Sequence, residues 1–389
     1  MTKKSGRSVW PLSAMTAALA LTLVVTACSS SGTTAASSAA APAASAATGG
    51  VAAAKTALAE YKSFDQKFAG PSTPYDQGTG TVAIISYGES VPVINDTSKG
   101  AKEAFEAAGW KVTGPFDGKF SPPVISGFID DAVQNKVDAI MLVIVTYRDQ
   151  AAAIDRALAA GIAVSALISE PSDFVDAGVA DKINLSTVDF TRQGKMMATW
   201  AVANSDGNVN AVITVDSGSF ATVKRADGNK QAFAEFCPDT CKAQDLTIPA
   251  ADISKPGPPQ WTAFVGANPV DSGINYAFGE ADVLAIPMYK TLKDIGRTDI
   301  TMIGYDADAE AVSLMTQPDS KYGATSGLPF TYAAWAGADL AMRQKAGAEM
   351  YDASSLPIIL VDKENAAQYT PYFAPPGDWR KTFTSMWQG

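Results

Sequence analysis

The pattern of apolar and polar positions divides the chain into an N-terminal region and a long regular region. Residues 17–27 are mostly apolar, and residues 29–50 carry no charge and no large apolar side chain. From residue 81 onward, short aliphatic runs alternate with amphipathic segments that have a helical period. Nearly continuous aliphatic strands that alternate with helices predict a parallel β-sheet covered by helices on both faces.

The alternation yields more strands than one compact sheet usually holds. The predicted strands are 81–87, 110–118, 137–145, 162–169, 208–218, 243–250, 274–281, 298–308 and 322–329. The predicted helices are 98–110, 124–135, 149–161, 191–206, 220–236, 283–296, 309–317 and 330–348, followed by an apolar run at 356–362. A further helix is predicted over 51–68, lying on the body of the protein. We therefore expect two doubly wound α/β lobes with parallel sheets.

The N-terminus has the features of an export signal. Lys3, Lys4 and Arg7 precede the apolar run, which is well short of the about 20 residues that a membrane span needs. The following Val-Thr-Ala-Cys ends at Cys28 and resembles the lipobox of bacterial lipoproteins. This resemblance implies that residues 1–27 are removed and that Cys28 becomes a lipid-modified N-terminus. An ordinary secretory peptide with an incidental cysteine is the alternative. Residues 28–50 are predicted to form a flexible tether.

Composition limits the chemistry that is open to the chain. It has no histidine, which excludes Ser-His-Asp and Cys-His nucleophile activation and His-ligated zinc. No strand is followed by a glycine-rich nucleotide-binding motif, so we predict no cofactor and no metal. The net charge of -10 argues against nucleic acid as a partner. Cys237 and Cys241 are predicted to form a short-loop disulfide in an oxidising compartment, with a free thiol pair as the alternative.

Four stretches together resemble a known family. They are 81–112, 137–164, 300–315 with its Gly-Tyr-Asp, and 323–330. Their order is similar to that in ribose-type (type I) periplasmic sugar-binding proteins of bacterial ABC transporters, over roughly residues 80–362. The resemblance implies two lobes joined by a three-segment hinge. Lobe one would comprise 80–187 plus 328–356, lobe two 188–327 plus 357–389, and residues 51–79 would form an N-terminal helix and linker.

Ligands of open α/β sheets bind outside the carboxyl ends of the strands. The resemblance assigns sugar contacts to Arg225 and Asp306; the alternatives are a solvated helix arginine and a helix N-cap. Loops at the strand ends supply further candidates, namely Tyr87, Glu89, Ser90, Tyr147, Ser169, Phe220, Glu280 and Phe330. The chain departs from the ribose-type pattern, because Val93-Ile94 stands in place of an aromatic pair. Polar contacts of that pattern are replaced at Ile168-Ser169, at Glu280 or Ala281, and at Gly327, which makes ribose itself a poor candidate.

These features predict a binding protein and no enzyme activity. We expect a lipid-anchored, extracytoplasmic receptor on the bacterial cell membrane. As a monomer, it would capture a small polar ligand, a sugar or polyol, and deliver it to an ABC transporter permease. Two alternatives stay open: an exported enzyme that uses carboxylates such as Glu89 with Asp306, and a sensor that signals to a membrane kinase.

Overall fold

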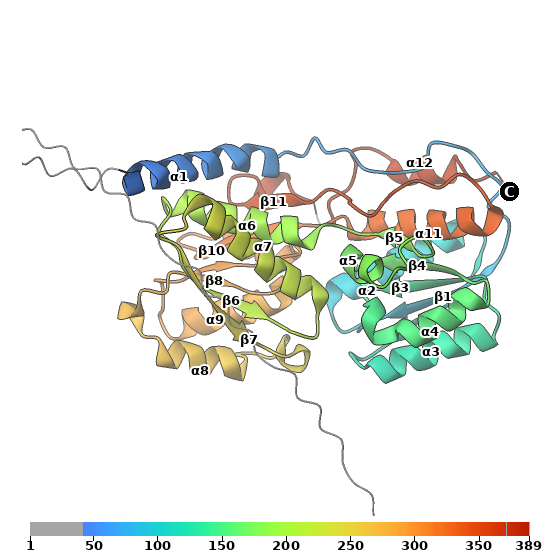
Figure 1. Cartoon of the computed structure of the whole chain (residues 1–389), viewed down its shortest axis with the longest axis horizontal. Helices are drawn as coiled ribbons and strands as arrows, with labels where there is room; N and C mark the ends of the chain where they lie inside the picture. The colour runs from blue at the N-terminus through green and yellow to red at the C-terminus, as the bar shows by residue number, and fades with distance from the viewer. Residues whose placement is uncertain (1–41, 371, 389) are drawn as a thin grey trace, which may run out of the picture. The chain divides into compact units, whose positions relative to one another are not determined.

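The chain from Pro42 onward forms two α/β lobes, each built on its own sheet (Figure 1). The structure is a computed structural model that describes residues 42–370 and 372–388. The predicted signal peptide, Cys28 and the part of the predicted tether before residue 42 lie outside the described residues. Within the described residues, no helix has the length and apolar character needed to cross a membrane.

Lobe one contains a five-stranded parallel sheet in the order β2-β1-β3-β4-β5. Its strands are β1 (Thr81–Ser86), β2 (Lys111–Asp117), β3 (Ala139–Val143), β4 (Ala163–Leu167) and β5 (Asn184–Ser186). Its helices are α2 (Pro92–Ala107), α3 (Pro122–Gln134), α4 (Tyr147–Ala159), α5 (Pro171–Asp176) and α11 (Phe330–Ala346). Helices α2 and α11 pack together on one face, and α3 and α4 pack together on the other. The sheet is thus buried on both faces, as its aliphatic strands predict.

Lobe two contains a six-stranded sheet in the order β11-β10-β9-β8-β6-β7. Its strands are β6 (Asn210–Val215), β7 (Lys242–Thr247), β8 (Tyr276–Phe278), β9 (Thr301–Ile303), β10 (Tyr322–Gly327) and β11 (Ile359–Asp362), the last antiparallel to β10. Helices α6 (Phe190–Asn204) and α7 (Phe220–Phe236) cover one face. The other face is covered by α8 (Pro259–Ala267), α9 (Asp282–Asp294) and α10 (Ala309–Met315). The predicted architecture of two doubly wound lobes is confirmed.

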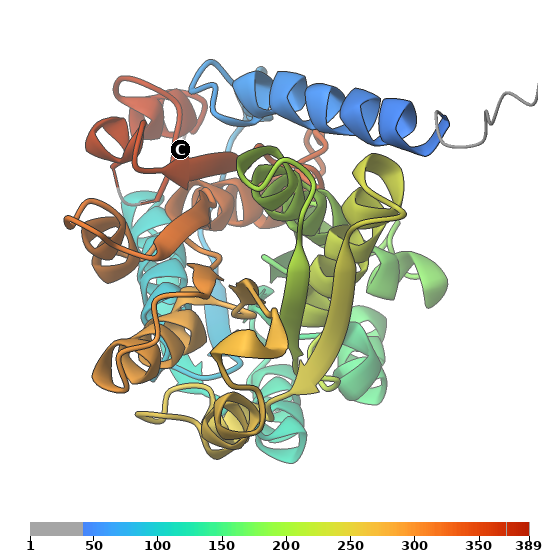
Figure 2. The same ribbon diagram turned by 90° about the vertical axis from the view of Figure 1, so that its left-hand side faces the viewer.

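The N-terminal helix α1 (Pro42–Tyr61) begins before the predicted start at residue 51. The tether prediction is therefore wrong for residues 42–50, which are helical. Alanine has the strongest helix propensity and proline is tolerated in the first turn, so this alanine-rich stretch extends the helix once α6 and α7 support it (Figure 2). Gly50 permits the close contact, because a Cβ there would lie 2.1 Å from the carbonyl oxygen of Phe236.

The end of the C-terminal segment packs on lobe one, whereas the sequence predicted that all of 357–389 belongs to lobe two. Strand β11 does lie in lobe two, but helix α12 (Trp379–Thr384) packs against α11. Trp387 stacks on Trp335 of α11 with ring centroids 5.7 Å apart, and the Arg380 Nε donates to Glu103 of α2 at 2.8 Å. Large aromatic side chains near the end of the chain bury most area against other aromatics, and those lie on α11.

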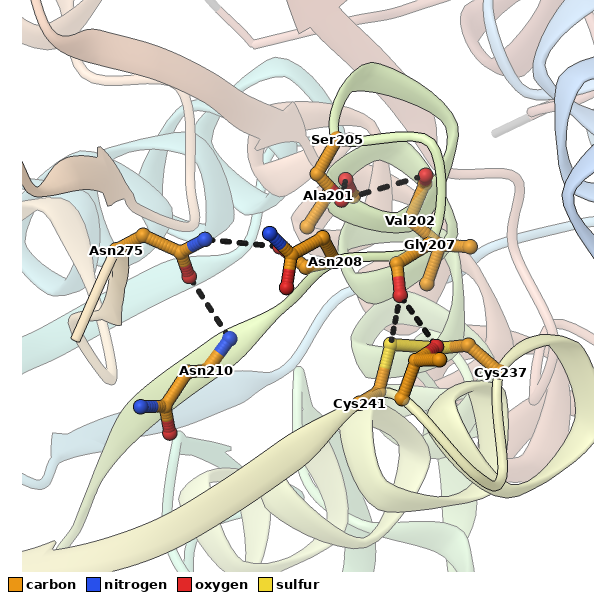
Figure 3. Close-up of a disulfide and its surroundings, with 10 residues drawn as sticks. Ala201, Val202, Ser205, Gly207, Asn208, Asn210, Cys237, Cys241 and Asn275 are labelled. Atoms are coloured by element: carbon orange, nitrogen blue, oxygen red, sulfur yellow. Dashed lines mark hydrogen bonds between the residues drawn. A yellow bond between two sulfur atoms is a disulfide. The ribbon is translucent and has the colours of Figure 1, made fainter. Parts of the chain in front are cut away.

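Cys237 and Cys241 form the predicted disulfide (Figure 3). Cys237 follows the last residue of α7 and Cys241 precedes the first residue of β7, so the bridge closes the turn between this helix and this strand. The Thr240 hydroxyl donates to the carbonyl of Gly207 at 2.6 Å, which ties the same turn to the start of the lobe-two sheet. The bridge therefore lies where α7 ends and β7 begins, away from the carboxyl ends of the lobe-two strands.

Candidate ligand-binding site

A cavity of about 100 Å³ lies between the two lobes. Its lining residues follow strands: Tyr87 comes directly after β1, Ile144 after β3 and Ile168 after β4. On the other side, Asp216 follows β6, and Glu280 and Asp306 come shortly after β8 and β9. The carboxyl ends of both sheets thus face one shared space, which is where ligands of open α/β sheets bind.

Lobe one contributes an almost entirely hydrocarbon surface, the lobe-one wall, formed by Tyr87, Val91, Val93, Ile94, Phe120, Ile144, Ile168 and Phe330. Its single side-chain polar atom is the Tyr87 hydroxyl. Burial raises the pKa of Tyr87, so the phenol stays neutral. Its ring meets Phe120 edge-on at a centroid distance of 5.1 Å. Gly88 makes room for this pair, since a Cβ there would lie 2.5 Å from the Phe120 ring.

Lobe two contributes every charged side chain of the cavity. This lobe-two wall carries the polar residues Asp216, Ser219, Thr222, Arg225, Glu280 and Asp306, together with the apolar residues Phe190, Ala221, Ala250, Ile253, Ala281 and Val283. Three carboxyl groups therefore accompany one guanidinium group on this wall. The cavity is divided into an apolar side and a polar, acceptor-rich side.

Arg225 is buried and donates hydrogen bonds to the protein from all three of its guanidinium nitrogens. Its Nε donates to Gln193 Oε1 at 2.8 Å, its Nη1 to the Glu280 carbonyl at 2.6 Å and its Nη2 to Asp306 Oδ1 at 2.7 Å. The guanidinium also lies over the rings of Phe190 and Tyr305, at 5.2 and 4.9 Å from their centroids. The alternative of a solvated helix arginine is wrong, because only 6% of the residue is exposed.

Two glycines place Arg225 by allowing α6 and α7 to touch. A Cβ on Gly194 of α6 would lie 1.9 Å from the Arg225 carbonyl oxygen. A Cβ on Gly228 of α7 would lie 2.0 Å from the Thr191 carbonyl oxygen. Any larger residue would separate the two helices. The close crossing brings Gln193 of α6 within hydrogen-bonding distance of the guanidinium.

Asp306 pairs with Arg225 and does not cap a helix. Helix α10 begins at Ala309 with Asp308 as its N-cap, so the N-cap alternative for Asp306 is wrong. Its backbone has φ +96°, a region that non-glycine residues seldom occupy, and its N–H donates to the Ser326 carbonyl at 2.9 Å. Burial raises the pKa of Asp306, and the adjacent Arg225 opposes that rise.

The loop that carries Asp306 is held in place by Asp282, which lies in the strand-end loop 280–282 that the binding rule for open α/β sheets selects from the sequence. Asp282 is fully buried and accepts from the Tyr322 hydroxyl at 2.5 Å, from Thr325 Oγ1 at 2.9 Å and from the Asp308 N–H at 2.9 Å. Burial, and then the charge of Asp308, raise the pKa of Asp282 well above its usual range. Asp282 acts on the loop and does not line the cavity.

Glu280 is the polar group that the protein leaves open. It is 5% exposed, and its Oε2 has no hydrogen-bond partner within the described residues. Its backbone is fixed, because its N–H donates to Thr214 Oγ1 at 2.7 Å and its carbonyl accepts from Arg225. Burial, with Asp216 adding to it and Arg225 opposing it, raises the pKa of Glu280 to about 8. A buried carboxyl oxygen without a partner is costly, so this atom is available to a ligand.

Five of the residues predicted from sequence line the cavity: Tyr87, Arg225, Glu280, Asp306 and Phe330. Ser169 and Phe220 instead line an adjoining recess of about 30 Å³, to which Tyr87 also contributes. The Arg148 guanidinium of lobe one covers the Phe220 ring at 3.9 Å, so this ring makes a contact between the lobes.

Glu89, Ser90 and Tyr147 line neither space. The Glu89 carboxylate accepts from Asn95 Nδ2 at 2.7 Å and from Ser98 Oγ at 2.6 Å. These bonds direct it toward α2, the helix that follows it. Ser90 is exposed, and the Tyr147 hydroxyl donates to Asp155 at 2.7 Å. Helix α2 begins at Pro92, so Val93 and Ile94 lie in its first turn. These two side chains line the cavity, whereas Glu89 and Ser90 of the preceding loop do not.

The strand-end loop 216–220, which the same rule selects from the sequence, contains the lining residue Asp216 directly after β6. Several other lining residues were not predicted. Thr222 and Phe190 lie in the first turns of α7 and α6. Phe120 follows β2. Within the described residues, no group of three or more His, Cys, Asp or Glu side chains is arranged to hold a metal ion.

Comparison with known proteins identifies the family of the chain. The family profile described as periplasmic binding protein domain matches residues 81–349, more than half of the chain. The chain therefore belongs to the periplasmic binding protein family, and the resemblance to its ribose-type, type I members is confirmed. No curated protein gives a match.

Solved structures share the fold at low sequence identity. A solute-binding protein of an ABC transporter from Agrobacterium vitis, with bound allitol, has a TM-score of 0.66 at 20% identity, covering 75% of this chain and 97% of its own. One from Mycobacterium smegmatis, with bound glycerol, has 0.65 at 20% identity, covering 77% and 100%. A 5-methylthioribose transporter protein from Thermotoga lettingae, in complex with 5-methylthioribose, has 0.64 at 16% identity, covering 81% and 99%.

Proposed function

We propose that this protein is an extracytoplasmic solute-binding lipoprotein. It captures a small hydroxyl-bearing ligand, a sugar or polyol, between its lobes and hands it unchanged to an ABC transporter permease. The observation that carries the proposal is the cavity at the facing strand ends, where the Arg225–Asp306 pair lies beside the unpartnered Glu280 Oε2. The solutes bound by the neighbouring structures, allitol and glycerol among them, support the ligand class.

Binding in this arrangement works by closing the lobes. A ligand that touches both walls favours the closed state by the difference between its affinities for the closed and the open state. The Arg148–Phe220 contact joins the two lobes and adds to the closed state, because this cation–π contact is lost when the lobes separate. No step of this cycle needs a catalytic group.

Anchoring is part of the same proposal. The lipobox-like sequence before Cys28 supports a lipid-modified N-terminus, which would keep the binding module near its membrane partner. Intact-mass spectrometry of the protein purified from its membrane fraction should show a diacylglyceryl group on Cys28. A mature protein of unmodified mass would contradict the anchor and leave solute binding untouched.

The binding function is tested by calorimetry with allitol, D-allose, myo-inositol and glycerol. We expect at least one to bind and to be recovered unchanged. Asp306→Asn should weaken that binding by roughly tenfold or more, since a charge-assisted acceptor is lost. Asp130→Asn, on an exposed face of lobe one, is the matched control and should bind normally. Chemical conversion of the bound compound would contradict the proposal. Failure of the folded protein to bind these solutes and their partly deoxygenated or O-alkylated derivatives would contradict it as well.

A further inference from the structure

The two walls of the cavity have opposite chemistry. The lobe-one wall offers aliphatic and aromatic carbon, and the Tyr87 hydroxyl is its only polar side-chain atom. All six other polar side chains that line the cavity belong to lobe two. A fully hydroxylated sugar presents hydroxyl groups on every edge, and those that face hydrocarbon lose their bonds to water without replacement. This cavity is therefore built for a molecule with one apolar side.

The lobe-two wall offers acceptors and no free cation. Arg225 already donates through three of its nitrogens to Gln193, the Glu280 carbonyl and Asp306. Glu280 Oε2 has no partner, and Asp216 adds a further carboxylate. An anionic ligand would meet three carboxyl groups and a guanidinium that is already paired. The wall instead suits hydroxyl donors, and a protonated Glu280 can both donate to and accept from a hydroxyl.

We infer that the ligand is a neutral amphipathic alcohol, a sugar or cyclitol in which part of the hydroxyl set is replaced by hydrogen, alkyl or aryl. Its apolar side lies on the lobe-one wall and its hydroxyl groups face Glu280 and its neighbours on lobe two. The inference rests on the proposed function and narrows its ligand class. Val93 and Ile94 fit the inference, because both contribute hydrocarbon to the lobe-one wall.

Matched pairs of compounds test this preference by calorimetry. Suitable pairs are D-galactose with 6-deoxy-D-galactose, D-glucose with phenyl β-D-glucoside, and myo-inositol with a mono-O-methyl ether. We expect the less polar member of at least one pair to bind about tenfold tighter or more than its parent. Parents that bind as tightly as their derivatives, or more tightly, would overturn the inference while the proposed function stands. Failure of every parent and derivative to bind the folded protein would overturn both.

A second pair of compounds tests whether the polar group of the ligand that faces lobe two is neutral. We expect 2-phenylethanol to bind in preference to 2-phenylethylamine, because the inferred ligand is neutral. Tighter binding of the amine would overturn the alcohol assignment and would point to an ammonium group on Glu280.

Two substitutions connect the preference to the two walls. Val93→Thr keeps the side-chain shape but adds a hydroxyl to the lobe-one wall, so it should reduce the ratio of affinities between derivative and parent at least threefold. Val164→Thr, buried in β4 away from the cavity, controls for a general loss of stability and should leave the ratio unchanged. Glu280→Gln should weaken derivative and parent by a similar factor. A ratio that Val93→Thr leaves unchanged would contradict the placement of the apolar side on lobe one.

Discussion

Removing the Arg225 side chain should destabilise the protein far more than removing an exposed arginine. Asp306, its ion-pair partner, is only 6% exposed and would remain buried without a counter-charge. Gln193 Oε1 and the Glu280 carbonyl would each lose a donor as well. Breaking a buried ion pair from one side costs about 3–5 kcal/mol, because the other charge stays desolvated. We expect a loss of that size in the free energy of unfolding of Arg225→Ala.

Arg156 supplies the matched control. It makes two bonds to Asp130, at 2.9 and 2.8 Å, but both side chains are substantially exposed. Exposed pairs contribute about 0–1 kcal/mol, so Arg156→Ala should lie in that range. Urea unfolding of both variants at one pH and ionic strength gives the comparison, with the denaturant slope checked for equality.

A double-mutant cycle then isolates the pair. Asp306→Ala alone leaves Arg225 buried with two remaining acceptors, and the double variant leaves no unpaired charge. The sum of the losses in the free energy of unfolding of the two single variants should therefore exceed the loss in the double variant by about 1–3 kcal/mol. If Arg225→Ala costs no more than Arg156→Ala, or if the two single losses are additive, the pair is not coupled and our account of the site is wrong.

Three further predictions concern other parts of the molecule. Burial raises the pKa of Glu280 from 4.5 to about 8. Between these pH values the folded protein keeps a proton that the unfolded chain releases, so the free energy of unfolding falls as pH rises through that window. Glu280→Gln should flatten this slope, by at most about 1.4 kcal/mol per pH unit, and an unchanged slope in urea titrations at pH 5 to 8 would contradict the assignment. Reduction of the Cys237–Cys241 bridge should cost about 2 kcal/mol or less, since it closes a very short loop; a larger loss by urea unfolding with and without reductant would show that the bridge orders more than its turn. Gly194→Ala should lower the melting temperature because its Cβ would meet the Arg225 carbonyl, whereas Gly127→Ala, which has open space in α3, should leave it unchanged or raise it.

Short-range pattern predicted most of the secondary structure. The strand 81–87 and the helix 220–236 correspond closely to β1 and to α7. A short continuous apolar run and a period of 3.6 are both visible in neighbouring residues. Helix α5 and strand β5 escaped prediction, since segments this short have too few residues to establish a period. The disulfide between Cys237 and Cys241 was also predictable, because four residues of chain keep the two thiols close in any fold.

The site was only partly predictable, and Glu89 and Glu280 illustrate the reason. Both carboxylates follow a strand at the same end of their sheets. Glu89 is taken up by Asn95 and Ser98 of the helix that follows it, whereas Glu280 faces the cavity with an open oxygen. Their difference depends on which groups other elements bring near, and no local pattern contains that information.

The sequence by itself determined the alternation of strands and helices, the doubly wound class of each lobe and the pairing of its two neighbouring cysteines. Tertiary structure alone decided that the C-terminal aromatics cover α11 of lobe one and that Arg225 pairs with groups from α6 and from the ends of β8 and β9. It also decided that the cavity is apolar on one side and polar on the other. Periodicity depends on residues a few positions apart, while burial and partner choice depend on contacts between segments separated by up to hundreds of residues.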